Sequence, residues 1–505
     1  MQIQLCFSAA FLMKLFHQEI VSVKQDAVLQ KGINERGTMS DPRDIYHFLA
    51  ETTARYGERT AFSWLRDREL QNATYSDFFY HVRQTAQYLS DILGDEKRVA
   101  MVAENSYAWL TFYWGTMLLG KSAVLIDPEM DSGEIEKRLE LFGIRFVFVA
   151  EETPEFRCAE RVPIVLPQGP ALPLDGYGEQ DHEKTEAAVL FSTGTTGDFK
   201  SIRMSQRSIV TCITAHTMEH AESIFLPLPF YHKLAQEGVV ASMQYGRRLF
   251  IGSGIKYVLK DLKTFAPELI WVTPVYMNML VQRFLRHGAD AAAAERVFGS
   301  NLKYILTGGA RPQKQAIEAL RAGGVRIISS YGSSETANIA SGELSEEEKC
   351  VGWPAPHVQL RFEDGEIVVK SPSLFLGYRD GEDVADDWYH TGDLGYLDEQ
   401  GRLFLTGRKK NLIILSNGKN VSPEHLEAEL FTISHVAEAI VYGEDDRICA
   451  EIYEDTLSEE TRQQIRAGIR QLNLAKPTYY HIQKIIFREE PFPRVGVGKI
   501  RRNNH

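Results

Sequence analysis

A short segment rich in glycine and hydroxyl side chains follows an apolar run in the middle of the chain. Residues 188–191 are apolar, and residues 192–200 read Ser-Thr-Gly-Thr-Thr-Gly-Asp-Phe-Lys. Glycines let the backbone curl around an anion, while hydroxyls, amide N–H groups and the lysine attract phosphate oxygens. The segment is not a Walker loop, because Asp198 follows the second glycine and the Gly-Lys-Ser/Thr ending is missing. We predict a phosphate-binding loop formed by Ser192, Thr193, Gly194, Thr195, Thr196, Gly197 and Lys200.

This loop resembles the phosphate-binding motif of the AMP-forming superfamily of acyl-CoA synthetases, luciferases and peptide-synthetase adenylation domains. Phe199 stands where that motif usually has proline, which leaves the glycines, the hydroxyls and Lys200 intact. Further elements follow in the superfamily's order up to the C-terminal region, so the family does not rest on one motif. Within the superfamily, the chain is most like the fatty acyl-CoA ligase branch.

Residues 331–335, Tyr-Gly-Ser-Ser-Glu, resemble the superfamily's Tyr-Gly-x-Thr-Glu element. The resemblance implies that Tyr331 stacks on adenine, that Ser334 contacts the α-phosphate and that Glu335 holds Mg²⁺. Magnesium between phosphates needs only one or two carboxylates, so a single glutamate is chemically sufficient. The remaining nucleotide-binding residues implied here are Gly332 and the segment along the adenine and acyl pocket, Gly308, Gly309 and Ala310.

Two elements near residue 400 resemble the ribose-binding part of the superfamily. Residues 389–393 read Tyr-His-Thr-Gly-Asp, and the resemblance implies that Asp393 accepts both ribose hydroxyls. It also implies that Arg408 lies near the ribose and that Lys410 is the hinge between two domains.

The last two elements belong to the C-terminal region. Residues 417–421 resemble the loop whose glycine, here Gly418, lines the pantetheine tunnel during thioester formation. Residues 493–499 resemble the element that carries the catalytic lysine, here Lys499. In the superfamily the C-terminal domain rotates between the two half-reactions, which exchanges the lysine for the glycine loop.

Residues 225–232 indicate the class of acid substrate, because they resemble the Leu-Pro-x-x-His element of acyl-CoA and aryl-CoA ligases. In that element the histidine, here His232, borders the carboxylate and ATP sites. Amino-acid-activating relatives usually carry an aspartate in this region, whereas the first acid here is Glu237. We expect a medium- or long-chain fatty acid, with an aryl acid second, because small or aliphatic residues that suit an apolar tail follow: Leu234, Ala235, Val239, Val240, Ala241 and Met243.

The resemblance implies an enzyme with ATP, Mg²⁺ and CoA as cofactors. A small-molecule carboxylic acid attacks the α-phosphorus of ATP, pyrophosphate leaves, and the acyl group passes to the CoA thiol. Lys499, Glu335 and His232 are the expected catalytic residues. Three alternatives stay open: a stand-alone enzyme that loads the phosphopantetheine of an acyl or peptidyl carrier protein, a luciferase-like oxygenase, and a non-catalytic nucleotide-binding protein.

The pattern of apolar runs predicts the elements that must position these residues. From about residue 43, helical patterns alternate with short buried strands that end in Gly- or Thr-rich turns, which is typical of mostly parallel sheets covered by helices. After Gly365, alternating strands indicate antiparallel structure, and a compact α+β pattern begins near Asn411. We predict an α/β protein with a large N-terminal domain of mixed, mostly parallel sheets plus a small β-rich region, and a small mobile α+β C-terminal domain.

The predicted domains are an ATP- and acyl-binding unit at residues 39–409 and a catalytic lid at residues 410–505. Residues 1–38 are interpreted as an extension, with Met39 as an alternative start.

Composition narrows the remaining possibilities. The net charge of −12 over 505 residues disfavours a nucleic-acid surface, and no apolar run reaches the ~20 residues of a membrane span. The five cysteines are widely spaced and are expected to be reduced structural thiols of a cytoplasmic protein. The sequence predicts no particular oligomeric state.

Overall fold

The computed structural model describes residues 42–150, 153, 155–174, 182–193, 199–211, 221–288, 290–309, 312, 314–344, 347, 349–379, 381, 384, 387–416, 419–454, 456, 458–495 and 499–500. Residues 1–38, with the two interpretations of the start, lie outside this range. In the part of the chain that is described, no helix is both long enough and apolar enough to cross a bilayer.

A seven-stranded sheet forms the first layer of the large domain. The strands from β7 to β6 run parallel, with α4 connecting β3 to β4 and α5 connecting β4 to β5, while β8 and β18 extend the sheet in antiparallel fashion beyond β7. In spatial order the strands are β18 (Gly377–Tyr378), β8 (Phe199–Ser205), β7 (Glu186–Thr193), β4 (Ser122–Leu125), β3 (Arg98–Val102), β5 (Phe146–Val149) and β6 (Glu160–Pro163).

A thirteen-stranded sheet forms the second layer. Its centre, from β13 to β1, is parallel, and both ends are antiparallel. In spatial order the strands are β16 (Gln359–Glu363), β17 (Glu366–Lys370), β19 (Tyr389–Leu397), β20 (Leu403–Arg408), β15 (Cys350–Pro354), β14 (Ala337–Glu343), β13 (Arg326–Ser333), β12 (Tyr304–Gly308), β11 (Leu269–Val272), β9 (Ser223–Leu226), β10 (Arg248–Ile251), β1 (Thr60–Arg66) and β2 (Glu69–Thr74).

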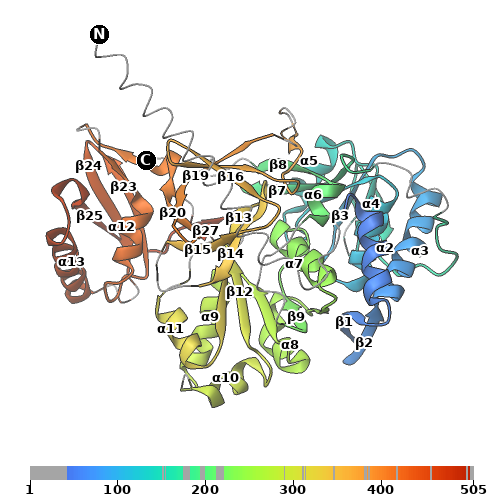
Figure 1. Cartoon of the computed structure of the whole chain (residues 1–505), viewed down its shortest axis with the longest axis horizontal. Coiled ribbons are helices and arrows are strands. Elements are labelled where there is room, and N and C mark those ends of the chain that lie inside the picture. The colour runs from blue at the N-terminus through green and yellow to red at the C-terminus, as the bar shows by residue number, and fades with distance from the viewer. Residues whose placement is uncertain are drawn as a thin grey trace, which may run out of the picture.

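Helices cover both faces of the parallel parts of the two sheets, as their buried strands require (Figure 1). Neighbouring strand residues divide between two cores: Leu269 packs with α7, and Ile270 packs with α8 to α11. The helices of the large domain are α2 (Ile45–Tyr56), α3 (Tyr75–Leu93), α4 (Tyr107–Leu118), α5 (Ser132–Leu141), α6 (Gln206–Val210), α7 (Lys233–Gln244), α8 (Val258–Phe265), α9 (Pro274–Leu285), α10 (Ala291–Phe298) and α11 (Lys314–Ala322), with a 3-10 turn, η3 (Ile255–Tyr257).

Helices α4 and α7 share one core with strands of both sheets. All residues of α7 except Leu234 are buried, and all of α4 except Ala108. A helix that is buried all round packs inside a protein and has no solvent face. The residues of α7 expected to line an acyl tail are therefore mostly core residues: Ala235, Val239, Val240, Ala241 and Met243 are at most 2% exposed.

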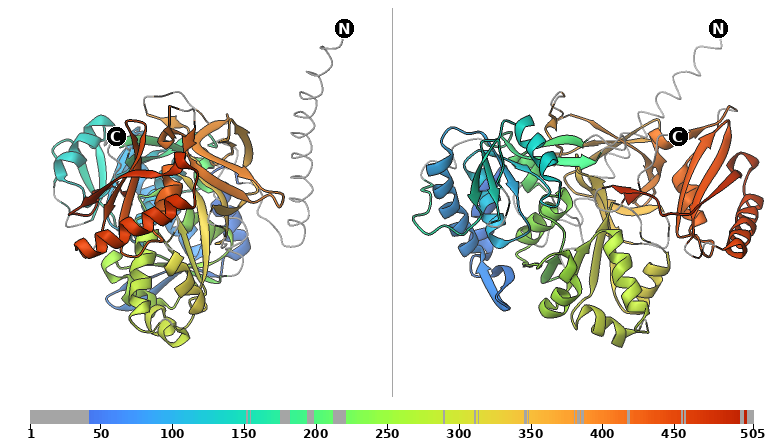
Figure 2. Two further views of the ribbon diagram at one scale, coloured as in Figure 1. Left: turned by 90° about the vertical axis from the view of Figure 1, so that its left-hand side faces the viewer. Right: turned by 180° about the vertical axis from the view of Figure 1, so that it is seen from behind.

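The C-terminal region forms a separate core around a three-stranded sheet. Helix α13 lies on the face of this sheet that points away from the large domain, and α12 lies on the other face (Figure 2). The elements are η4 (Lys409–Asn411), β21 (Ile413–Ile414), β22 (Asn420–Val421), α12 (Pro423–Leu430), β23 (Glu438–Glu444), β24 (Arg447–Tyr453), α13 (Glu459–Leu474), η5 (Thr478–Tyr480), β25 (Ile482–Arg488), β26 (Arg494–Val495) and β27 (Lys499–Ile500).

The predicted α/β class and its two-part architecture are confirmed, with one difference in topology. Antiparallel pairing was expected after Gly365, but β14 already pairs antiparallel with β13, and the pairs β1–β2 and β7–β8 are antiparallel as well. Only a short turn joins β13 to β14, whereas a parallel connection needs a crossover of a dozen or more residues. The β-rich region is therefore continuous with the parallel sheet.

One buried histidine makes the stability of this domain sensitive to acid. Both ring nitrogens of His357 are buried and lack a hydrogen-bond partner among the described residues. Burial lowers the pKa of His357 from 6.5 to about 4. The unfolded chain binds a proton near pH 6.5 and the folded chain does not, so the free energy of unfolding falls as the pH falls from 6.5 towards 4.

Replacing His357 by leucine is expected to remove this dependence. Relative to H357L, the wild type should lose about 2 kcal/mol of unfolding free energy between pH 7.5 and pH 5. Urea unfolding followed by tryptophan fluorescence reports on the large domain, because all six tryptophans precede residue 410. H287L is the control, since the His287 ring is at the surface. An identical pH dependence in the wild type and H357L would contradict the prediction.

Candidate active site

The first wall of the site is the end of β13 and its turn into β14. The pairing of these strands shifts between Tyr331 and Gly332, which turns the following residues out of the sheet. A side chain at Gly332 would place its Cβ 1.9 Å from the carbonyl oxygen of Ala337, so only glycine fits. The turn is closed by the Thr336 hydroxyl, which accepts the Ser333 N–H at 3.0 Å. Ser334 lies half-buried in the same turn.

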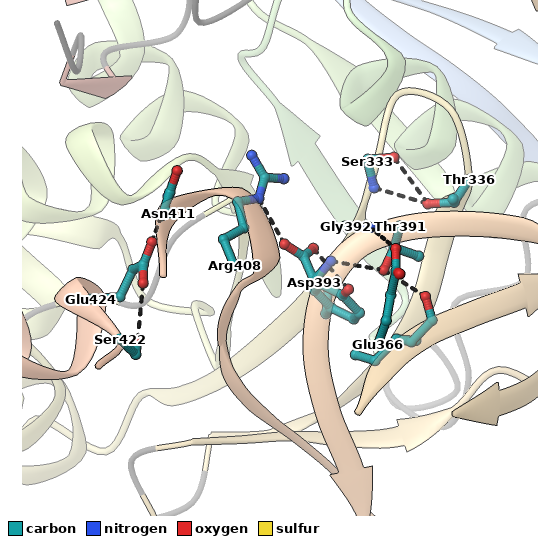
Figure 3. A network of polar contacts seen from close by, with 12 residues as sticks. Ser333, Thr336, Glu366, Thr391, Gly392, Asp393, Arg408, Asn411, Ser422 and Glu424 are labelled. Atoms are coloured by element: carbon teal, nitrogen blue, oxygen red, sulfur yellow. Dashed lines mark hydrogen bonds and ion pairs between the residues drawn. The ribbon is translucent and has the colours of Figure 1, made fainter. Parts of the chain in front are cut away.

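Asp393 joins this wall to the neighbouring strands. The Tyr331 hydroxyl donates to Oδ2 of Asp393 at 2.9 Å, and Nε of Arg408 donates to Oδ1 at 2.7 Å (Figure 3). Burial, and then the charge of Asp393, raise the pKa of the Tyr331 phenol well above its usual value. Burial alone would lower the pKa of Arg408, but Asp393 outweighs it and the pKa rises. The phenol and the guanidinium are both held protonated.

This arrangement leaves Asp393 able to bind a ribose. A carboxylate has about four lone-pair directions, and each oxygen of Asp393 uses one of them here. Asp393 also sits rigidly, because its own N–H donates to the Thr391 hydroxyl at 3.1 Å. Each oxygen can therefore accept one further hydroxyl, which is the pattern of a 2′,3′-diol.

Glu335 and Lys200 are linked through a tyrosine. The Tyr378 hydroxyl donates to Oε1 of Glu335 at 2.9 Å, and Nζ of Lys200 lies 4.7 Å from the centre of the Tyr378 ring. Burial, followed by the charge of Glu335, raises the pKa of the Tyr378 phenol, so the hydroxyl remains a donor. Strand pairing of β18 with β8 brings these side chains from distant parts of the chain together.

The donor set around Glu335 fits magnesium shared with phosphates. Glu335 is half-buried, and a second carboxylate oxygen remains beside the one that accepts from Tyr378. Among the described residues, no group of three or more His, Cys, Asp or Glu side chains is arranged to hold a metal ion by itself. A metal held by one carboxylate must take its other ligands from substrate and water, as Mg²⁺ does when it bridges phosphates.

The Tyr378 hydroxyl is expected to contribute to nucleotide activation. Tyr378→Phe keeps the ring beside Lys200 and removes the hydrogen bond to Glu335. Hydrogen bonds to charged groups support a loss on the order of tenfold in kcat/KM for Mg·ATP, measured by ATP–pyrophosphate exchange. Tyr396→Phe is the matched control, because Tyr396 is exposed and stacks on Phe404. Equal rates in Y378F and Y396F would contradict the assignment.

The candidate acid site lies beside the start of α7. His232 precedes the helix without capping it, and its ring packs against Tyr231 with centroids 4.5 Å apart. Burial lowers the pKa of His232, and the charge of Asp127 opposes this only in part, so the imidazole is neutral at pH 7. A neutral ring can accept or donate a hydrogen bond without a charge of its own.

The glycines after β12 form the floor next to this helix. A Cβ at Gly308 would lie 2.9 Å from the Ser330 carbonyl oxygen and 3.7 Å from Cδ1 of Leu234. Gly309 has a φ of 88°, which favours glycine. Leu234 is the residue of α7 that is not fully buried, and it faces this floor.

Several predicted residues cannot be placed. Lys499 pairs with Val495 in the β26–β27 hairpin, of which only the backbone is described. The hairpin lies between the small and large domains in Figures 1 and 2. The backbones of Ser192 and Thr193 end β7. The other predicted residues lie outside the described range: Gly194, Thr195, Thr196, Gly197, Ala310 and Gly418.

Two polar residues of the site were not predicted. Tyr378 follows an apolar run and a glycine, and Glu366 begins a strand of alternating character. Each contacts predicted residues only through tertiary structure, so spacing along the chain carries no sign of it. The one signal in the sequence is that each residue stands next to an apolar run: Glu366 precedes one, and Tyr378 follows one after a glycine.

Two family models match the chain. The model described as AMP-binding enzyme matches residues 49–379, and the model described as AMP-binding enzyme C-terminal domain matches residues 410–505.

Among curated proteins, the chain is similar to 2-succinylbenzoate–CoA ligases. The protein of Geobacillus sp. (strain WCH70) is 27% identical over 435 residues, which cover 80% of this chain and 86% of the relative. The protein of Lactococcus lactis subsp. lactis is 25% identical over 451 residues, which cover 86% of this chain and 95% of the relative.

Solved structures share the fold. The o-succinylbenzoate CoA synthetase of Bacillus subtilis, in complex with its acyl-adenylate intermediate, has a TM-score of 0.70 at 21% identity and covers 90% of this chain and 96% of that chain. An anthranilate CoA ligase in complex with anthranoyl-AMP has a TM-score of 0.73 at 19% identity, with coverage of 92% and 96%.

Proposed function

Because this chain belongs to the AMP-binding enzyme family and is an AMP-forming acid–thiol ligase, we propose that it activates an aromatic carboxylic acid and transfers the acyl group to CoA. ATP, Mg²⁺ and CoA are the cofactors of this ligase family. The proposal keeps the predicted division into residues 39–409, which bind ATP and the acid, and residues 410–505, the catalytic lid.

The observation that carries the proposal is that two clusters of polar side chains lie at the same ends of the sheets. Asp393, held by Tyr331 and Arg408, offers the acceptors that a ribose needs. Glu335 and Lys200, joined by Tyr378, offer the opposite charges that metal-bound phosphates need. Tyr331 of the first cluster lies near the end of β13, and Glu335 of the second cluster lies a few residues later, in the turn to β14. One bound nucleotide can therefore reach both clusters.

In the proposed first step, a substrate carboxylate oxygen forms a bond to the α-phosphorus and the bond to pyrophosphate breaks. Two anions must approach each other, so the residues act by positioning and by neutralising charge. Asp393 fixes the ribose, Lys200 and Lys499 supply positive charge, and His232 stays neutral beside the entering carboxylate. Bound Mg²⁺, for which Glu335 is the proposed ligand, neutralises charge on the phosphates.

The choice of an aromatic acid departs from the first expectation of a fatty acid. The curated relatives described above are named for 2-succinylbenzoate, and a structural neighbour binds anthranoyl-AMP. A fatty acyl-CoA synthetase of Mycobacterium tuberculosis shares the fold at a TM-score of 0.61. The names of the relatives favour the second of the two predicted acids.

The packing of α7 supports the same choice. Val239 and Val240 line a cavity of about 10 Å³ together with Trp109 and Phe230. That volume holds about one water molecule, whereas a long alkyl chain needs a tunnel many times larger.

The test is a competition between acids and between acceptors. Purified full-length protein is given Mg·ATP, CoA and equal concentrations of 2-succinylbenzoate, anthranilate, benzoate, octanoate and palmitate, and the thioesters are separated by mass. Aryl thioesters as the main products are expected, while a main product from octanoate or palmitate would overturn the choice of acid. Preferred transfer to an acyl or peptidyl carrier protein added with CoA would overturn the choice of acceptor.

A further inference from the structure

Glu366 is a buried carboxylate that the proposed reaction does not use. It begins β17, its side chain is 5% exposed, and three donors surround it. It accepts hydrogen bonds from the Gly392 N–H at 3.1 Å, from Nζ of Lys409 at 2.6 Å and from a ring nitrogen of His390 at 3.2 Å. Pairing offsets the cost of burying a carboxylate, and the donors that pair with Glu366 come from two different parts of the fold.

The first of these parts is the loop that carries Asp393. Gly392 directly precedes Asp393, and its φ of 72° is one of several conformations that glycine adopts readily, so the hydrogen bond to Glu366 selects this one. Figure 3 shows Glu366 beside Gly392 and Thr391, with Asp393 next to them. Burial alone would raise the pKa of Glu366, but Lys409, His390 and the Gly392 amide lower it, so the group is charged at neutral pH.

The second part is the link between the domains. Lys409 begins η4, directly after Arg408, so two consecutive residues of the link are paired with the large domain. On the other side, the Asn411 side chain donates to Glu424 of the small domain at 2.6 Å. Lys410 is the one residue between these two sets of contacts.

We propose that Glu366 is a positioning residue that ties the interdomain link to the Gly392–Asp393 loop. The ion pair with Lys409 fixes the large-domain end of the link. The same carboxylate fixes the backbone of Gly392, so the position of the ribose-binding loop and the position of the link depend on one group. The role of Glu366 in catalysis rests on the proposed function, whereas its structural tie between Lys409 and Gly392 does not.

Limited trypsin digestion without substrates tests the tie. Glu366→Gln keeps an oxygen for Gly392 but removes the charge that holds Lys409. Cleavage at residues 408–410, identified by fragment mass, is expected to be about three- to fivefold faster than in the wild type, the range for an ion pair with one exposed partner. Glu363→Gln is the matched control, because Glu363 pairs with Arg361 and His390 and, among the described residues, acts on Lys409 only through its more distant charge and not through an ion pair. Equal cleavage of E366Q and E363Q would overturn the inference, whatever acid the enzyme activates.

A double-mutant cycle tests the coupling to catalysis. E366Q and Lys409→Met are each expected to lower kcat for adenylation about three- to fivefold, with KM for ATP within twofold, and the double variant should match the single ones. Glu366→Ala, which also removes the acceptor for Gly392, should raise KM for ATP in addition. Additive effects of E366Q and K409M, or an unchanged KM in E366A, would overturn the coupling. Absence of acid activation in the wild type would count against the proposed function, and the digestion would still test the tie.

Discussion

Lys499→Ala is expected to reduce acid-dependent pyrophosphate release by roughly 10²–10³-fold, the loss seen when one preorganised charge donor is removed from a reacting centre. The transition state gathers negative charge from the carboxylate and the phosphates, and Lys499 is proposed to neutralise part of it. Strand β27, which Lys499 begins, lies between the two domains.

The second half-reaction separates this role from general damage to the protein. Chemically synthesised acyl-AMP and CoA should form thioester in K499A at a rate within about threefold of the wild type, because no α-phosphoryl transfer remains. Lys484→Ala is the control: Lys484 forms an exposed ion pair with Glu444 in the same domain. Normal pyrophosphate release by K499A, or an equal loss in K484A, would contradict the role.

Asp393→Asn is expected to lower kcat/KM for ATP by roughly 10²-fold, mainly through KM, because two hydrogen bonds to a charged group are weakened. The amide keeps the size of the side chain but can accept with one oxygen only. The charge that pairs with Arg408 disappears as well, so the guanidinium is no longer held in place.

The measurement is ATP–pyrophosphate exchange at varied ATP, with AMP binding by calorimetry as an activity-independent readout. Asp398→Asn is the matched control, since Asp398 pairs with Arg402 at the other end of the β19–β20 hairpin. Unchanged AMP affinity in D393N would show that Asp393 does not hold the ribose.

The elements of the fold could be predicted because their apolar patterns are strong. The mostly apolar runs at residues 98–102 and 269–272 and the helical pattern at residues 459–474 coincide with β3, β11 and α13. Long-range pairing was harder to predict. The place where β14 turns back along β13 depends on a short turn closed by Thr336, and no apolar pattern marks it.

The residues of the site likewise divide into those that local motifs predict and those that depend on long-range pairing. Asp393, Arg408 and Tyr331 belong to local motifs, and the structure brings them into direct contact. Tyr378 and Glu366 act across strands that are distant in sequence, so only the folded chain reveals their partners.

The residues expected to line an acyl tail are mostly core residues in the structure, and the sequence could not show this for a related reason. Apolar residues after His232 suit either a pocket or a core, and α7 lies in a core shared by both sheets. Composition alone does not distinguish these two uses of small and aliphatic side chains.

Pyrophosphate release from Mg·ATP, measured with each acid of the panel and with and without CoA, tests the central claim most directly. The account predicts release that requires an acid, is fastest with an aryl acid, and turns over repeatedly only when CoA is present. ATP binding without pyrophosphate release for any acid would contradict it.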